Sequence, residues 1–373
     1  MLDVSLLPPL TADEWPRVRD IVIPIDLHNT GGSEVAETNL EQAVCFLGSL
    51  GLRRLYHPEE RGVFQRLLPL FTEVASQIGS GRRRFRVDFD GMSFRAQLGA
   101  NAGGHDLTLR VLPDHAPSLS DLRLPAGLRT VLTSKELLDG GLLLIVAPNG
   151  QGKTTTASAI VRTRLQAFGG FALTVEDPCE LPLQGVWGEG LCIQRPVIPL
   201  DPYEAPGDGI YRALIGALRQ FPAISQGTML LVGEIQDGKT AVETLKAAIH
   251  GHLVIATLHA RSAADAIRRM VSLCATVPHA MDTDTARELL AAAVRGVWYQ
   301  RLHWSQEGAG WGMGEISGHV LWNSSAGHVL GAIANGSYDR LAEISVRQTE
   351  VIKRLGLRPV TAEQVFELLT EAR

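Results

Sequence analysis

The stretch GLLLIVAPNGQGKTTTASAIV, residues 141–161, decides the fold. Its apolar start predicts a buried strand, its centre a glycine-rich loop, and its end a helix that begins at Lys153. This order is the context that a phosphate-binding loop requires, because backbone N–H groups and the helix N-terminus together hold the phosphates. The stretch therefore predicts an α/β protein with a nucleotide site at the end of this strand.

The loop itself supplies the predicted nucleotide contacts. Lys153 is expected to reach the β- and γ-phosphates of ATP, and the Thr154 hydroxyl to hold Mg²⁺. Ala147 stands where the usual pattern G-x-x-x-x-G-K-[ST] has its first glycine, and it fits there if its φ is negative. A glycine-rich turn with a chance lysine is the alternative. The predicted cofactor-binding residues are Ala147, Pro148, Asn149, Gly150, Gln151, Gly152, Lys153, Thr154 and Thr155.

Acidic residues end two further predicted strands. The run TMLLVGEIQD (228–237) places Glu234 where it would orient or deprotonate the attacking water and support Mg²⁺ through a water molecule. The run LTVEDPCE (173–180) offers Glu176 and Asp177 for positioning a metal or water. The alternative for Glu234 is a glutamate that caps the next helix, and for the second run it is a solvated acidic turn.

Histidines bracket the predicted strand in HGHLVIATLHARSA, residues 250–263. His259 lies a whole strand length from His252, so these two and His250 cannot easily converge on a metal. His259 falls at the carboxyl edge of the sheet, where the ligands of α/β proteins bind. We therefore expect His259 to take part in a polar relay near the γ-phosphate.

The second part of the chain alternates apolar strands with amphipathic helices, which predicts a parallel sheet covered on both faces. This block, residues 126–373, follows a proline-rich linker predicted at 112–125. It is expected to be mostly helical beyond residue 263. The helices expected in it lie at 153–168, 208–220, 283–301, 337–355 and 361–372, with a hairpin region at 303–333.

The first block, residues 1–111, is predicted to contain a β-hairpin. Apolar residues alternate on both sides of Asp90-Gly91, a pair that favours a tight turn because both positions need a positive φ. Arg86, Arg95 and Arg110 alternate with apolar neighbours and should lie away from the buried face. Strands are also expected at 21–26 and 106–112, and helices at 38–51 and 60–78.

The composition excludes several classes of protein. The chain has 373 residues, 45% of them hydrophobic, which is far above the range of disordered chains. Its net charge of −5 disfavours binding to nucleic acid by bulk electrostatics, so no direct nucleic-acid partner is expected. The four cysteines include no C-x-x-C pair, which excludes a zinc ribbon. Without a signal peptide or an apolar run of the ~20 residues that span a membrane, we expect a cytoplasmic chain with no transmembrane segment.

The four motifs, in the order phosphate loop, TVEDPCE, VGEIQD and GHLVIATLHARSA, resemble the secretion ATPase superfamily. It includes the motors of type IV pili, the type II secretion ATPases, and the type IV secretion or conjugation ATPases. The resemblance covers roughly residues 84–302. It implies a PAS-like α+β domain followed by a RecA-like P-loop domain with a mostly helical C-terminal part. It also implies a homo-hexameric ring that uses ATP and Mg²⁺, with inner-membrane platform or secretion-channel proteins as partners.

The resemblance assigns roles to exposed arginines as well. Arg95 and Arg110 look like the arginines of the N-terminal domain that sense the γ-phosphate, and two solvated strand arginines are the alternative. Arg219 also resembles a family position. One departure is Gln236, which replaces an arginine that the family usually has in the VGEIQD motif.

Missing segments narrow the branch of the superfamily. The four-cysteine zinc module of the extension motors and the AIRNLIRE-like segment of the retraction motors are not found, so the chain looks more like the DotB-type ATPases. The leading prediction is an ATP hydrolase that drives a secretion, conjugation or pilus machine from the cytoplasmic side. The alternative, to which Gln236 points, is a slow or inactive nucleotide-bound subunit of the same machine. The acidic balance opposes a nucleic-acid motor.

Overall fold

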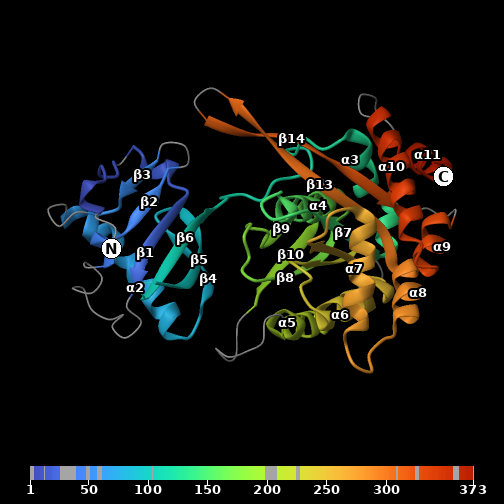
Figure 1. Ribbon diagram of the computed structural model, residues 1–373, viewed down its shortest axis with the longest axis horizontal. Coiled ribbons are helices and arrows are strands. Elements are labelled where there is room, and N and C mark those ends of the chain that lie inside the picture. Colours follow the sequence, from blue (N-terminus) through green and yellow to red (C-terminus); the bar gives the residue numbers. More distant parts are fainter. Residues whose placement is uncertain are drawn as a thin grey trace. The chain divides into compact units, whose positions relative to one another are not determined.

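The computed structural model divides the chain into two compact units (Figure 1). The first contains Met1–Asp114 and Asp177–Pro182, and the second contains His115–Glu176, Leu183–Ile198 and Ala205–Arg373. The change at 114–115 lies inside the predicted linker 112–125, in which residue 112 ends a strand and residues 113–125 form bends and turns without a helix or strand. The described residues are 4–11, 13–25, 39–47, 51–56, 61–102, 104–197, 208–223, 227–307, 310–323, 327–355 and 361–372.

An antiparallel sheet with the strand order β3-β2-β1-β6-β5-β4 forms the first unit. Phe94 and Leu109 are fully buried on one face of it, in a core that also contains Phe71 and Val74 of helix α2. The elements are β1 (Asp20–Ile25), β2 (Val44–Phe46), β3 (Leu52–Arg54), α2 (Arg61–Gly79), β4 (Arg84–Phe89), β5 (Met92–Asn101) and β6 (Gly104–Leu112).

Most elements predicted for the first block are confirmed. Asp90 and Gly91 have φ values of 52° and 74°, which is the backbone that their tight turn requires. The helix predicted at 38–51 is helical only at residues 39–41: residues 44–46 form strand β2, and residues 38 and 48–50 lie outside the described part. Strand β2 pairs with β1 and buries Cys45 opposite Ile21. This long-range pairing, which local sequence does not reveal, decides the conformation there.

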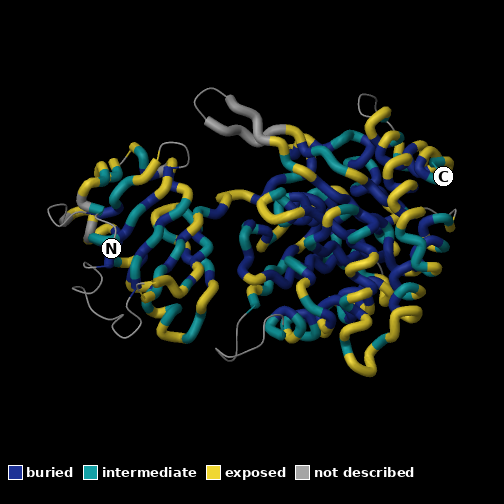
Figure 2. Tube along the Cα trace, viewed as in Figure 1, coloured by how far each residue is buried: buried dark blue, intermediate teal, exposed yellow. Residues whose placement is uncertain are grey.

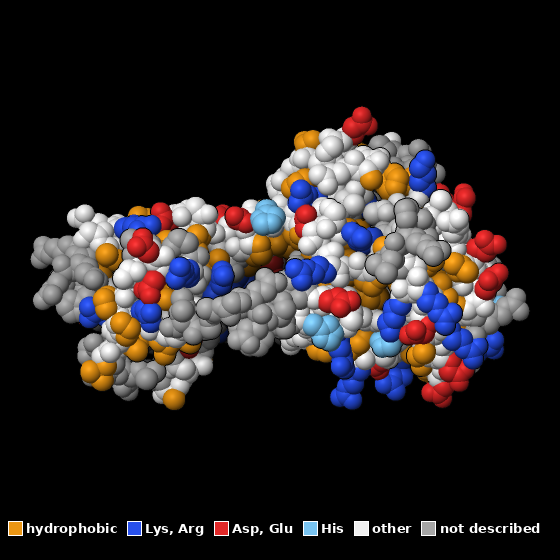
Figure 3. Space-filling model, turned by 90° about the horizontal axis from the view of Figure 1, so that it is seen from above, with side chains coloured by type: hydrophobic (Ala, Val, Ile, Leu, Met, Phe, Trp, Pro, Cys, Tyr) orange, Lys and Arg blue, Asp and Glu red, His pale blue; other side chains and the backbone are white. Residues whose placement is uncertain are grey.

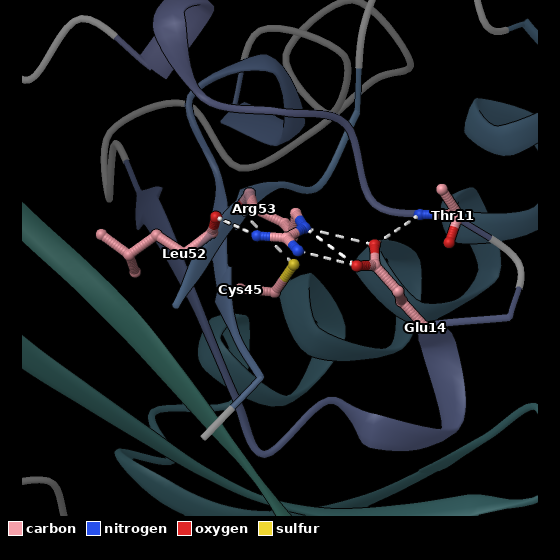
Figure 4. Close-up of polar contacts among 5 residues, drawn as sticks. All are labelled: Thr11, Glu14, Cys45, Leu52 and Arg53. Atoms are coloured by element: carbon pink, nitrogen blue, oxygen red, sulfur yellow. Dashed lines mark hydrogen bonds and ion pairs between the residues drawn. The ribbon is translucent and has the colours of Figure 1, made fainter. Parts of the chain in front are cut away.

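A polar cluster ties the segment before β1 to strand β3 (Figure 4). The Arg53 guanidinium donates from Nη2 and Nε to Glu14 Oε1 at 2.8 and 3.1 Å, and the backbone N–H of Thr11 donates to Glu14 Oε2 at 3.2 Å. The hydrogen bond from Arg53 lowers the pKa of the Glu14 carboxyl. Burial raises the pKa of the Cys45 thiol beside them to about 12. We interpret this cluster as structural.

Six neighbouring parallel strands form the centre of the second unit, in the order β13-β7-β12-β11-β8-β10. The edge strands β14 and β9 are antiparallel to their neighbours. All parallel strands therefore end at the same edge of the sheet. The strands are β7 (Gly141–Val146), β8 (Gly170–Glu176), β9 (Gly185–Trp187), β10 (Gly190–Pro196), β11 (Thr228–Val232), β12 (Leu253–Leu258), β13 (Val294–Glu307) and β14 (Gly310–Trp322).

Helices bury both faces of this sheet, as predicted (Figure 2). Every residue of β7 and of β12 is buried. On β7, Leu142 and Leu144 belong to a core shared with α6, α7 and α8, while Leu143 lines an apolar pocket with Leu128 of α3. The helices are α3 (Ala126–Leu132), α4 (Lys153–Phe168), α5 (Asp208–Leu218), α6 (Gly238–Ile249), α7 (Ala263–Ala275), α8 (Thr283–Ala293), α9 (His328–Ala334), α10 (Tyr338–Arg354) and α11 (Ala362–Glu371).

The C-terminal part differs from the prediction in one consequential place. The helix predicted at 283–301 ends at Ala293 as α8, and Val294 begins the long strand β13. Strand β13 pairs with β7 on one side and β14 on the other, so the hairpin spans 294–322 and not 303–333. The helices predicted at 337–355 and 361–372 are present as α10 and α11. No described helix is long and apolar enough to cross a membrane.

Candidate nucleotide site

Four adjacent strands bring the predicted motifs to one edge of the second sheet. Strands β7, β12, β11 and β8 lie side by side and run parallel. The loop 147–152 follows β7, His259 follows β12, Glu234 follows β11, and Glu176 ends β8. Open α/β sheets bind ligands outside the carboxyl ends of their strands, so these residues form a candidate site.

The loop has the backbone that close approach to a ligand requires. Gly150 and Gly152 have φ values of 72° and 75°, which side chains tolerate poorly, and Gly152 is the N-cap of α4. Among the described residues, Asp90 and His279 are the only residues other than glycine with a positive φ. Ala147, which is fully buried, therefore does not need to be glycine. Pro148 and Asn149 are exposed, whereas Thr154 and Thr155 are half-buried in the first turn of α4.

Lys153 lies inside the loop, with its side chain turned back on the chain that precedes it. Its ammonium donates to the carbonyl oxygens of Ala147 and Pro148 at 3.1 and 3.0 Å, and Nζ lies 3.3 Å from His259 Nδ1. The residue is only 8% exposed. The carbonyl oxygens that hold the charge here would be replaced by phosphate oxygens if a nucleotide entered the loop.

His259 connects Lys153 to Glu234. Its Nε2 lies 2.6 Å from Glu234 Oε1, and Gln236 Nε2 donates to Glu234 Oε2 at 2.7 Å. Burial, together with the charge of Lys153, lowers the pKa of His259, so the imidazole is neutral at pH 7. A neutral ring fits both contacts only if Nε2–H donates to Glu234 and Nδ1 accepts from Lys153. The structure thus contains a continuous chain of hydrogen bonds from Lys153 through His259 to Glu234.

The other histidines of this motif lie elsewhere. His252 precedes β12 at the opposite end of that strand, where its Nδ1 lies 2.9 Å from Thr228 Oγ1 and its ring stacks on Phe221. Burial lowers the pKa of His252 as well. Nowhere in the described ranges do three or more His, Cys, Asp or Glu side chains gather as a metal-binding group.

Glu176 and Glu234 are neighbours at the ends of β8 and β11. Glu176 is 2% exposed and accepts a hydrogen bond from Gln194 Nε2 at 3.2 Å. Gly233 packs so closely against it that an added Cβ would lie 3.2 Å from the Glu176 Cα. Asp177 clusters with the first unit, where it lies 3.7 Å from Arg84 Nη1, and burial raises its carboxyl pKa.

The predicted sensor arginines belong to the first unit. Arg95 of β5 and Arg110 of β6 are direct cross-strand partners, and Arg86 of β4 pairs with Arg95 in turn. The three therefore share the face of the sheet that lies away from the core, as the alternation predicts. Arg95 forms an ion pair with Glu180, and Arg110 Nε lies 2.7 Å from Asp20 Oδ1. Arg219 is exposed just beyond α5.

Two residues of β10 and β13 support the site although no local motif indicated them. Gln194 holds Glu176, and Gln300 contacts the loop at Gln151. The signal for β13 was its aromatic and β-branched run from Val294 to Tyr299, which favours a strand. The helical stretch that precedes this run masked it.

Residues 79–308 match the family described as "Type II/IV secretion system protein". The chain belongs to this family. That assignment confirms the superfamily predicted from the four motifs. The matched region contains the loop and every strand end of the candidate site.

Curated relatives in the secretion family match 58–60% of this chain. It is 35% identical over 225 residues to "Uncharacterized protein YggR" of Escherichia coli (strain K12), a match over 60% of this chain and 62% of that protein. It is 31% identical to "Putative type II secretion system protein E" of the same organism, over 60% of this chain and 40% of that one. It is 30% identical to "Twitching motility protein" of Neisseria gonorrhoeae, over 58% and 52%. The match thus spans less than two thirds of each relative.

Two solved structures share the fold of this protein over nearly its whole length. The pilus retraction motor PilT with bound ADP superposes with a TM-score of 0.64 at 23% identity, covering 94% of this chain and 93% of that one. The Legionella pneumophila ATPase DotB gives 0.62 at 18% identity, covering 97% and 94%. At these identities the likeness shows the fold. Both the retraction motor and DotB are among the structural neighbours.

Proposed function

We propose that the chain is a Mg²⁺-dependent ATP hydrolase that works as a hexameric ring and powers a secretion, conjugation or pilus machine. The observation that carries this proposal is the hydrogen-bonded chain Lys153–His259–Glu234 at the mouth of a glycine-shaped loop. Each of its members follows a different one of three adjacent parallel strands. Phosphoryl transfer requires a positive group that stabilises charge on the phosphate oxygens and a group that orients the attacking water. The ammonium and the carboxylate at the two ends of this chain can supply these two functions.

The residues at the edge of the sheet fit ATP and Mg²⁺. Backbone N–H groups of the loop and of the first turn of α4 suit phosphate oxygens, and Lys153 needs only to exchange carbonyl oxygens for them. The Thr154 hydroxyl and the carboxylate of Glu234, acting through water, are the hard oxygen ligands that Mg²⁺ prefers. Bound Mg²⁺ would neutralise charge between the β- and γ-phosphates.

Glu234 is the proposed group that orients or deprotonates the attacking water. His259 and Gln236 each donate to a different oxygen of its carboxylate, so its plane is fixed from both sides. Buried Glu176 is the proposed neighbour that positions metal or water. Gln236, which stands where the family usually has an arginine, still donates a hydrogen bond to this carboxylate. Because Glu234 stays held in place and Lys153 and Thr154 are intact, we favour an active enzyme over the inactive scaffold.

The ring and its partners are further parts of the proposal. Residues 1–111 are proposed as a PAS-like domain, 112–125 as a linker, and 126–373 as the RecA-like domain with a helical C-terminal part. Arg95 and Arg110 are the proposed sensors of the γ-phosphate. The proposed partners are inner-membrane platform or secretion-channel proteins, which the chain would meet from the cytoplasmic side. On the face seen in Figure 3, Lys and Arg side chains lie among Asp and Glu side chains, which fits protein partners better than nucleic acid.

Replacing Lys153 by alanine tests nucleotide binding. The variant should bind Mg²⁺-ATP roughly ten- to a hundredfold more weakly, because each charge-assisted hydrogen bond contributes about 1.5–3 kcal/mol. Calorimetry on the purified chain measures this loss. Lys246→Ala, which removes an exposed lysine paired with Glu243 on α6, is the matched control and should bind normally. Equal dissociation constants for Lys153→Ala and the wild type would contradict the proposed site.

Assembly is tested by adding a non-hydrolysable ATP analogue. Light scattering should then report a mass close to six chains, and electron microscopy should show closed rings. The proposed physical reason is that ATP bound at the loop of one subunit would also be sensed by Arg95 and Arg110 of a neighbouring subunit, which would hold the two subunits together. A strict monomer at micromolar concentration with the analogue bound would contradict the ring while leaving the nucleotide site intact.

A further inference from the structure

Strand β13 reaches the phosphate loop from the side opposite to His259. It runs parallel to β7, and Tyr299 pairs with Val146, the last residue of β7 before the loop. The next residues of β13 are therefore level with the start of the loop. Neither Gln300 nor its neighbours on β13 have a role in the function proposed above.

Two hydrogen bonds join this strand to Gln151, in the middle of the loop. Gln300 Nε2 donates to the backbone carbonyl oxygen of Gln151, and the backbone N–H of Leu302 donates to Gln151 Oε1 at 2.9 Å. Gln151 stands between the two glycines with positive φ. An added Cβ on Gly152 would lie 3.5 Å from Gln300 Nε2, so the carboxamide packs directly against the loop.

The burial of Gln300 indicates that its hydrogen bond to Gln151 is the reason for a polar residue at position 300. Gln300 is completely buried, and no hydrogen-bond partner is found for its Oε1 among the described residues. An unpaired buried amide oxygen costs free energy that an apolar side chain of the same shape would avoid. The hydrogen bond to the Gln151 carbonyl is what glutamine supplies and an apolar residue could not.

We propose that Gln300 is a positioning residue that fixes the phosphate loop in its anion-binding shape. In a trans peptide the C=O and the following N–H point in opposite directions. Holding the Gln151 carbonyl toward β13 therefore turns the Gly152 N–H away from β13, as a donor for phosphate. With the peptide reversed, a carbonyl oxygen would face the phosphates and repel them. This inference rests on the proposed function, since it takes phosphate as the ligand of the loop.

Gln300→Met tests the proposal, because methionine keeps the length and the buried volume but lacks the donor. Gln348→Met is the matched control: Gln348 of α10 is also buried, at 2% exposed, and its hydrogen bonds go to Trp322 and Leu369, away from the loop. Both variants should melt at a lower temperature than the wild type. Only Gln300→Met should bind Mg²⁺-ADP at least tenfold more weakly, with a smaller rise in melting temperature at a fixed ADP concentration.

A second variant keeps the proposal testable if Gln300→Met does not fold. Gln300→Glu has nearly the same shape, and its carboxyl can donate to the Gln151 carbonyl only when it is protonated. Its affinity for ADP, relative to the wild type at each pH, should fall as the pH rises from 6 to 9. Affinity within twofold of the wild type for the folded variants at every pH would overturn the proposal. Absence of ADP binding by the wild type would instead overturn the proposed function, and this inference with it.

Discussion

Glu234→Gln should bind ATP as the wild type does and hydrolyse it about 10²–10⁴-fold more slowly, the range typical of a lost general base. The substitution preserves size but removes the negative charge. It also places an amide where two donors, His259 Nε2 and Gln236 Nε2, now converge on carboxylate oxygens. One of those contacts must break, and the attacking water loses the carboxylate that would take its proton.

The measurement is steady-state hydrolysis alongside ATP affinity for the same preparations. Glu243→Gln, which removes an equivalent charge from α6, serves as the control and should retain normal turnover. Loss of turnover at unchanged affinity assigns Glu234 to the chemical step. Equal turnover in Glu234→Gln and the wild type would remove it from that role.

Arg95→Ala and Arg110→Ala should each bind nucleotide and lose most hydrolysis. Arginine fingers that stabilise charge on the γ-phosphate contribute about 10³–10⁵ in rate, and two arginines that share the task should each contribute less. Their contacts with Glu180 and Asp20 are ion pairs at a partly exposed surface, so their loss should cost little stability. The expected result is a folded, nucleotide-bound protein that turns over slowly.

Arg86→Ala is the matched control for these two variants. Arg86 lies in the same cross-strand row, but its guanidinium contacts Asp88 and Ser93 within its own hairpin, at 3.0 and 2.7 Å. Hydrolysis by Arg86→Ala should stay within twofold of the wild type, with assembly checked by light scattering for all three. If Arg95→Ala and Arg110→Ala both keep more than half of the activity, the first unit is a docking module for partners.

The secondary structure of the local motifs could be predicted because each motif is formed by residues that are contiguous in the sequence. The strand, loop and helix around Lys153 and the turn at Asp90-Gly91 depend on neighbouring residues, and the structure contains both. The strand ends at Glu234 and His259 followed from apolar runs that stop at a polar residue. Their meeting at one edge followed from the rule that parallel strands end together.

What the sequence concealed depends on long-range pairing. The alanine-rich run before Val294 suggests a helix that continues, and only pairing with β7 converts residues 294–307 into a strand. That error also concealed Gln300, since its contact with Gln151 spans 149 positions along the chain. Strand β2 is only three residues long and was missed for a related reason, because its pairing with β1 is not visible in the local sequence.

The loop is thus held on two flanks, by Lys153 and His259 on the side of β12 and by Gln300 and Leu302 on the side of β13. Ordering a flexible backbone costs roughly 1–2 kcal/mol per residue in conformational entropy. Because both flanks are fixed, the loop loses this conformational entropy when the chain folds and not when a nucleotide binds. ATP would then bind to a loop that already has its binding conformation. The affinity for ATP should depend mainly on how readily Lys153 exchanges the carbonyl oxygens of Ala147 and Pro148 for phosphate oxygens.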